Sequence, residues 1–177
     1  MLLHSLTILL FITFKNKGDK IPNWCNNNLT VGSDDPELIE SFKKAIDSDG
    51  LFQYLKPNPT GDWSYSWSVE NWGVKWDVDG DSINVVQLDD DRIIIEFDTA
   101  WGPPIEFYKH LESLGFNVVG MYYEPGMAFC GIYSNEFDEY YEFGDMTPEE
   151  IEDTIPDELN ECFMISEFAR DREDEDD

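Results

Sequence analysis

Four tryptophans that stand beside amide and carboxylate side chains are the first group of residues that could do chemistry. An indole ring stacks on bases, sugars and peptide groups, and a neighbouring polar group can orient such a ligand. The competing interpretation, which we favour, is that these rings pack in the core, where large aromatics dominate wherever they are buried. The candidate pocket for a small ligand consists of Trp24, Asn71, Trp72, Trp76, Asp77 and Trp101.

A second group consists of carboxylates crowded into the C-terminal part of the chain. Residues 135–177 contain 19 Asp and Glu against 2 Lys and Arg, out of 39 against 11 in the whole chain. Regularly spaced carboxylates can imitate a phosphate backbone, and a cationic partner relieves their mutual repulsion. The simpler interpretation is a solvated face with a frayed end. The candidate partner-binding surface consists of Glu149, Glu150, Glu152, Asp153, Asp157, Glu158 and Glu161.

Residue types that catalysis or metal binding usually requires are scarce in this chain. Histidine occurs only at His4 and His110, and the cysteines Cys25, Cys130 and Cys162 show no CxxC spacing. Neither a His-based zinc site nor a catalytic triad is indicated. Carboxylate pairs have little diagnostic value among 39 acidic residues. The sequence therefore predicts no catalytic residue, no metal ligand set and no cofactor.

One acidic stretch begins like a calcium-binding loop but does not continue as one. Asp77, Asp79 and Asp81 stand at the first, third and fifth positions of such a loop. Ser82 occupies the sixth position, where Gly is required, and Leu88 the twelfth, where a bidentate Glu belongs. Asp and Gly strongly favour turns, so the stretch predicts a turn between strands.

The net charge of −28 limits the partners that the chain can bind. Such a charge repels nucleic acid and anionic membrane surfaces, so we expect neither direct nucleic-acid binding nor membrane binding. A basic protein surface is the natural complement. The sequence does not indicate the oligomeric state.

Residues 1–20 differ in character from the rest of the chain. Their apolar run, residues 2–14, is shorter than the roughly 20 residues that a membrane-spanning helix needs. The basic residues follow this run, whereas a secretory signal has them before it. We interpret residues 1–20 as a non-native or disordered extension, with a signal or anchor segment as the alternative, and expect a cytoplasmic protein.

The elements that must position these residues can be placed from periodicity and turn residues. Helices are expected over 34–50 and 103–115, each with proline near its start and glycine at its end. The 65–72 segment is helical or extended, and residues 51–63 form a packed connector. Strands are expected at 27–33, 74–79, 83–88, 92–99, in a hairpin over 116–135 with its turn at 124–126, and near 137–143.

This order of elements predicts an α+β fold, specifically a ferredoxin-like two-layer sandwich with a mainly antiparallel sheet and two principal helices. The domain spans residues 21–143. Residues 144–170 form an acidic helical appendage in which Thr147 and a following proline begin a helix. Residues 171–177 are expected to be a disordered acidic tail.

Four stretches of the chain form a recognisable set of motifs. In chain order they are "PNWCNNNLTV", "ENWGVKWDV", "FDTAWGPP" and "YYEPGMAFCG". Together they resemble the YubB-like proteins of bacteriophages and conjugative plasmids. The resemblance covers about residues 21–143 and implies a ferredoxin-like domain; it implies no activity. In that family the first motif directly follows the initiator methionine, a place held here by Ile21, which supports the interpretation of residues 1–20 as non-native.

Three functions remain open from the sequence. The leading hypothesis is a non-enzymatic binding protein of a mobile genetic element that acts as an acidic decoy against a host nucleic-acid-binding or defence protein. The first alternative is a small-molecule or nucleotide-binding module, or an enzyme, that uses the tryptophan pocket. The second is a structural or assembly component of a phage.

Overall fold

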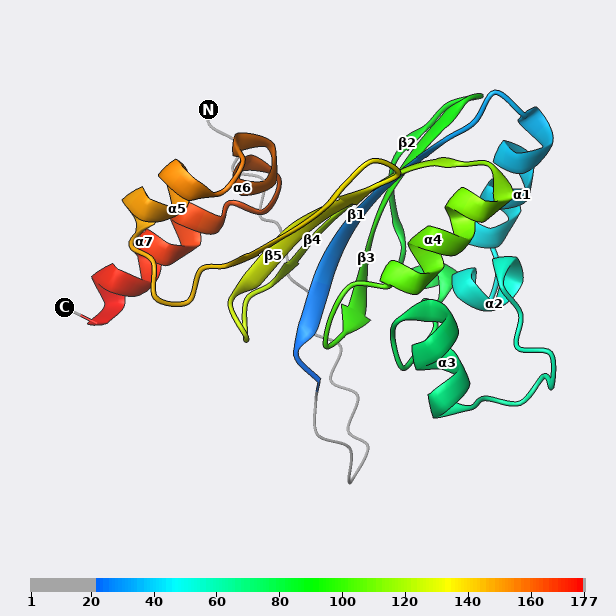
Figure 1. The fold of residues 1–177 in the computed structure, drawn as a ribbon, viewed down its shortest axis with the longest axis horizontal. Coiled ribbons are helices and arrows are strands. Elements are labelled where there is room, and N and C mark those ends of the chain that lie inside the picture. Colours follow the sequence, from blue (N-terminus) through cyan, green and yellow to red (C-terminus); the bar gives the residue numbers. More distant parts are fainter. Residues whose placement is uncertain (1–21, 177) are drawn as a thin grey trace, which may run out of the picture.

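A computed structural model describes residues 22–176 of the 177-residue chain, in which one six-stranded sheet is flanked by helices (Figure 1). The predicted extension, residues 1–20, lies outside the described residues. The strands are β1 (Trp24–Gly32), β2 (Asn84–Leu88), β3 (Arg92–Ala100), β4 (Asn117–Glu124), β5 (Phe129–Ser134) and β6 (Asp138–Glu142). They lie in the order β2-β3-β1-β4-β5-β6, and every neighbouring pair is antiparallel. The predicted α+β class with a mainly antiparallel sheet is confirmed.

Seven α-helices lie in the described part of the chain. They are α1 (Pro36–Ile46), α2 (Leu51–Leu55), α3 (Tyr65–Trp72), α4 (Ile105–Leu114), α5 (Pro148–Thr154), α6 (Asp157–Phe163) and α7 (Ile165–Asp176). Figure 1 shows α1–α4 against one face of the sheet and α5–α7 against the other. The two helices predicted over 34–50 and 103–115 correspond to α1 and α4. Helix α7 continues through residues 171–176, where the sequence predicts a disordered tail.

Strand β1 lies inside the sheet and pairs with β3 on one side and β4 on the other. Leu29 and Val31 are fully buried among the residues of α1 and α4, whereas Asn26, Asn28 and Thr30 are partly exposed on the opposite face. This alternation follows from the period of two in a strand. The "NNLTV" stretch therefore gives one face to the core and leaves the other polar.

The main core lies between the sheet and α1–α4, and aromatic rings fill its centre. The ring of Phe52 in α2 lies 4.4 Å from that of Phe107 in α4 and 6.1 Å from that of Phe97 in β3, measured between centroids. Tyr108 is fully buried, and its hydroxyl donates a hydrogen bond to the side-chain carbonyl of Asn27. The two buried polar side chains thus find hydrogen-bond partners in each other within the core.

Residues 74–79, predicted as a strand, form no strand in the structure. Val74 and Val78 are buried in the main core, and between them the carboxylate of Asp77 accepts hydrogen bonds from the start of α2. The prediction was wrong because this alternation of apolar and polar residues has another cause. The apolar residues anchor a connector in the core, and the polar Asp77 between them caps α2. Tertiary contacts override a short strand pattern in such a case.

Helices α5–α7 pack on the opposite face, against β4 and β5, and form a second core. The ring of Tyr123 in β4 stacks between those of Phe143 and Phe163, with centroids 5.6 Å from each. Ile132 of β5 and Leu159 of α6 are buried in the same cluster. Helices therefore cover both faces of the sheet at β4 and β5, whereas the sequence predicts two layers throughout.

Candidate functional site

The six predicted pocket residues do not share one cavity in the structure. Trp72 is 3% exposed and belongs to the main core, where its ring meets that of Trp67 edge to face at 5.3 Å. Its indole N–H donates to the backbone carbonyl of Lys56. The Asn71 side chain donates to the carbonyl of Trp67. Trp72 and Asn71 thus make the packing and backbone contacts of structural residues.

Asp77 caps the short helix α2. Its carboxylate accepts hydrogen bonds from the backbone N–H groups of Phe52 at 2.7 Å, Gln53 at 2.9 Å and Val78 at 2.7 Å. Burial raises the pKa of Asp77, and these three hydrogen bonds oppose the rise because they stabilise the charged form. With its oxygens turned to backbone donors, the carboxylate ties the connector to α2.

The other three tryptophans of the predicted pocket, Trp24, Trp76 and Trp101, lie at the surface near the start of β1. Trp24 and Trp101 are 46% and 45% exposed, and the ring of Trp24 lies 6.4 Å from that of Trp76. The ammonium of Lys75 lies 4.2 Å from the Trp76 ring centroid, as in a cation–π contact. Trp101 has a φ of 74°. Trp24 and Trp76 thus form an aromatic pair at the surface that a planar ligand could reach, and Trp101 is exposed directly after β3.

The predicted partner-binding carboxylates are all exposed in the structure. Glu150 completes a capping box with Thr147 at the start of α5. Glu152 accepts a hydrogen bond from the guanidinium of Arg170 at 2.6 Å, and this bond lowers the pKa of Glu152. The other five, Glu149, Asp153, Asp157, Glu158 and Glu161, have no cation within 4.0 Å among the described residues.

Apolar anchors fix these acidic helices to the sheet. Ile151 of α5 and Leu159 of α6 are fully buried in the second core. Met164, with a φ of 51°, makes the turn between α6 and α7. Across that turn the side chain of Asn160 accepts from the N–H of Ser166 at 2.9 Å and donates to its hydroxyl at 3.1 Å. The carboxylates are therefore displayed by a folded layer.

The sequence interpretation missed a further set of carboxylates on the open face of β3. Glu96 accepts hydrogen bonds from the side-chain amides of Asn28 and Asn84, at 3.3 and 2.8 Å. Asp98 accepts from the amide of Asn26 at 2.7 Å. Alternation in "RIIIEFDTA" and "CNNNLTV" indicates which residues of each strand point outward, but only the pairing of β1 with β3 brings the two outward rows together.

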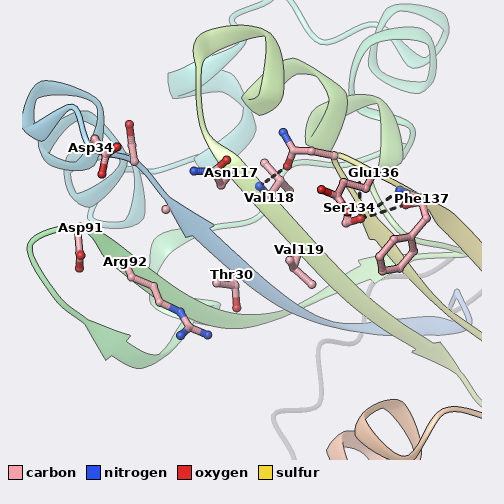
Figure 2. Close-up of a pocket in the computed structure, with 13 residues that line it drawn as sticks. Thr30, Asp34, Asp91, Arg92, Asn117, Val118, Val119, Ser134, Glu136 and Phe137 are labelled. Carbon is pink, nitrogen blue, oxygen red and sulfur yellow. Dashed lines mark hydrogen bonds between the residues drawn. The ribbon is translucent and has the colours of Figure 1, made fainter.

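A hollow of about 600 Å³ lies where β1 leads into α1 (Figure 2). Thr30, Arg92 and Val119 line it from three neighbouring strands, on the side of the sheet away from α4. Asp34 and Asp91 also line the hollow, so its wall carries carboxylates as well as the Arg92 guanidinium. The mixed charges favour neither an anion nor a cation.

The thiols of the chain are not activated. Burial raises the pKa of Cys25, that of Cys130 to about 12 and that of Cys162 to about 11. A thiol with a raised pKa stays protonated and is a poor nucleophile. Within residues 22–176, no three His, Cys, Asp or Glu side chains gather in a way that could hold a metal ion. No helix in that range is long and apolar enough to cross a membrane.

Comparisons of the chain with protein-family models, with curated proteins and with solved structures find no match. The described part of the chain offers three candidate binding surfaces: the exposed tryptophans near β1, the acidic layer α5–α7 and the open face of β3.

Proposed function

We propose that the chain is a non-enzymatic binding protein whose acidic layer, α5–α7, occupies the cationic surface of a basic partner protein. The observation that carries the proposal is that this acidic segment is a folded layer with its own core. A frayed solubilising tail needs no apolar anchor, whereas Ile151, Leu159 and Ile165 are fully buried. Carboxylates on a folded layer can match a fixed pattern of cations with less ordering on binding.

The proposed partner is a nucleic-acid-binding or defence protein of a bacterial host. A basic groove that accepts phosphates also attracts an ordered array of carboxylates, so the chain acts as a decoy. The net charge of −28 accelerates encounter with such a surface, and added salt weakens this attraction. The same charge repels nucleic acid, so decoy and nucleic acid compete without binding each other.

The proposal extends to the origin and compartment of the chain. The four motifs support membership among the YubB-like proteins of phages and conjugative plasmids. The strand order β2-β3-β1-β4, with α1 and α4 in the two crossovers, supports a ferredoxin-like core. We place the chain in the bacterial cytoplasm, where its three free cysteines would stay reduced.

Charge-neutralised variants test the decoy function. The first carries Gln or Asn at five α5–α6 positions and keeps Glu150 and Glu152, which cap and pair within the layer. The second, the matched control, removes five exposed charges elsewhere. The α5–α6 variant changes Glu149, Asp153, Asp157, Glu158 and Glu161. The control variant changes Asp49, Asp62, Glu70, Asp89 and Asp90.

Each immobilised chain is exposed to a bacterial lysate at about 100 mM salt, and captured proteins are then challenged with a DNA duplex. We expect the native chain and the control variant to capture basic proteins that DNA displaces, and the α5–α6 variant to lose them. Capture by the native chain and by the control variant should disappear at about 500 mM salt. Equal capture by the α5–α6 variant, or capture that resists salt, would refute the decoy function.

The exposed tryptophans support a second candidate, a module that binds a planar small molecule or nucleotide. The half-exposed rings of Trp24 and Trp101 and the Trp24–Trp76 contact favour it. Titration of nucleotides and aromatic metabolites should quench tryptophan fluorescence saturably, and Trp24→Ala should weaken the binding. No response across the panel would eliminate this candidate.

A further inference from the structure

A groove runs between the open face of β1 and β3 and the helices α6 and α7. Two adjoining hollows, of about 540 and about 310 Å³, form it. Asn26, Tyr123 and Phe168 line both hollows, which makes them one continuous depression. This groove is separate from the outward-facing carboxylates of α5 and α6 and from the exposed tryptophans.

The sheet wall of the groove carries two uncompensated carboxylates. Glu96 and Asp98 are exposed and line the hollow beside α6. Both are fixed by hydrogen bonds from side-chain amides of neighbouring strands, such as that of Asn26 to Asp98. No described Lys or Arg lies within 4.0 Å of either. A carboxylate accepts several hydrogen bonds, so both keep acceptor capacity for an incoming cation.

The helix wall of the groove is apolar. Phe168 of α7 is 46% exposed, and Met164 at the α6–α7 turn is 48% exposed. The ring of Tyr123 lies beneath them and is fixed in the second core. Exposed large apolar side chains gathered in a depression mark a binding surface more often than an inert one. The groove thus presents an apolar wall opposite a carboxylate wall.

One cation of the chain already stands at this groove. Arg172 and Asp171 line its outer hollow together with Tyr123. The charge of Arg172 acts on Tyr123, since it lowers the pKa of the phenol against the rise caused by burial. An incoming cation would meet repulsion from Arg172 and attraction from the carboxylates.

We propose that this groove binds a cationic peptide segment in which an aliphatic or aromatic side chain is flanked by arginines. The apolar side chain packs on Phe168 and Met164, and the guanidinium groups bond to Glu96 and Asp98, because the planar guanidinium matches a carboxylate. The inference rests on the proposed function, since this segment is the recognition element of the basic partner. Phosphate groups are repelled by the same carboxylates.

Fluorescence anisotropy with two labelled peptides of equal charge tests the groove on the full chain. One probe alternates arginine with leucine, and the other is oligolysine without apolar residues. We expect the native chain to bind the arginine–leucine peptide about tenfold more tightly than oligolysine. Equal affinity for the two peptides would overturn the groove, because carboxylates alone would then explain binding.

Three variants test the groove, two of which should lower the affinity for the arginine–leucine peptide and one of which should raise it. The double variant E96Q/D98N should weaken arginine–leucine binding about tenfold, and Phe168→Ala should weaken it about tenfold. Arg172→Gln should strengthen it about threefold, because a competing cation is removed. Thermal unfolding checks that the neutral isosteres, which keep carbonyl acceptors for the asparagine amides, stay folded. Unchanged affinity in E96Q/D98N, or weaker binding in Arg172→Gln, would overturn the groove.

The five-charge α5–α6 variant separates this inference from the function on which it rests. If it keeps arginine–leucine binding while E96Q/D98N loses it, the groove is the peptide site. If E96Q/D98N binds normally and the α5–α6 variant does not, the groove fails and the acidic layer remains the binding surface. If the peptide binds in the groove but lysate capture shows no salt-sensitive basic partner, the decoy function fails alone.

Discussion

The two helical layers cover opposite faces of one sheet, and they differ in how much apolar core holds them. Among the described residues, the main core contains 20 buried hydrophobic residues and the second core contains 9. The smaller core must hold helices whose exposed carboxylates repel one another. Helices α1–α4 therefore supply most of the stability, whereas α5–α7 are anchored just enough to display charge. The acidic layer should therefore open first.

The largest expected effect is on the main core. Phe52→Ala removes a ring that contacts Phe107 and Phe97, and should lower the free energy of unfolding by about 3–5 kcal/mol. Urea unfolding followed by tryptophan fluorescence measures this loss. Tyr54→Ala in the same helix is the matched control, since Tyr54 is 46% exposed. Similar losses for both would contradict the packing described for α2.

The corresponding change in the second core should be smaller and local. Leu159→Ala leaves a cavity under α6 and should cost about 2–4 kcal/mol, felt by the acidic layer. Hydrogen exchange should show α5–α7 losing protection while α1 and β1 retain theirs. Glu161→Ala, at an exposed position of α6, serves as control. Loss of protection in both layers together would show that they unfold as one unit.

The cap of α2 should contribute less to the free energy of unfolding than a buried side chain of either core. Asp77→Ala leaves backbone N–H groups of Phe52 and Gln53 without their acceptor and should cost about 1–2 kcal/mol in urea unfolding. The acidic layer should keep its hydrogen-exchange protection, because Asp77 touches only the main-layer side. A loss of protection in α5–α7 would break the distinction between the layers.

The pH dependence of this cap has a defined sign. Burial raises the folded-state pKa of Asp77 above the ordinary value of 3.8, so its contribution to stability is fully present below that pH. The contribution is lost as the pH rises through the folded-state pKa. Relative to Asp77→Asn, the native chain should therefore lose stability as the pH rises from about 4. A pH-independent difference between the native chain and Asp77→Asn would contradict this account.

The smallest effects come from matched helix caps in the two layers. Asp35 accepts from the N–H of Glu37 at the start of α1, and Thr147 accepts from that of Glu150 at the start of α5. Either residue replaced by Ala should cost about 1 kcal/mol. Hydrogen exchange should locate the first loss in α1 and the second in α5. Delocalised loss from Thr147→Ala would weaken the view of two separately anchored layers.

Much of the main layer could be predicted from the sequence because local signals agree there. Alternation in β1, the proline that begins α1 and the glycine that ends α4 specify elements with little help from the rest of the chain. The hairpin of β4 and β5 was also predicted correctly, although its turn lies at residues 125–128, one residue after the predicted start at Glu124. These signals place the elements but not their outer contacts.

The candidate sites depended on tertiary contacts that no local pattern contains. Trp72 and Trp76 are four residues apart, yet one is buried in the main core and the other lies beside Trp24 near the surface. Similarly, periodicity indicates that Asn26 and Leu29 lie on opposite faces of β1. It does not indicate that the Asn26 amide donates a hydrogen bond to Asp98. What covers each face of the sheet is decided by segments distant in sequence.

The position of β1 in the sheet has a consequence for synthesis. Its second partner, β4, begins at Asn117, 85 residues after β1 ends at Gly32. At roughly 5–20 residues per second, one side of β1 waits for about 4–17 seconds as an unpaired edge on the nascent chain. The consecutive asparagines Asn26, Asn27 and Asn28 make that waiting strand a poor template for aggregation, because asparagine is depleted in strands and favours hydration.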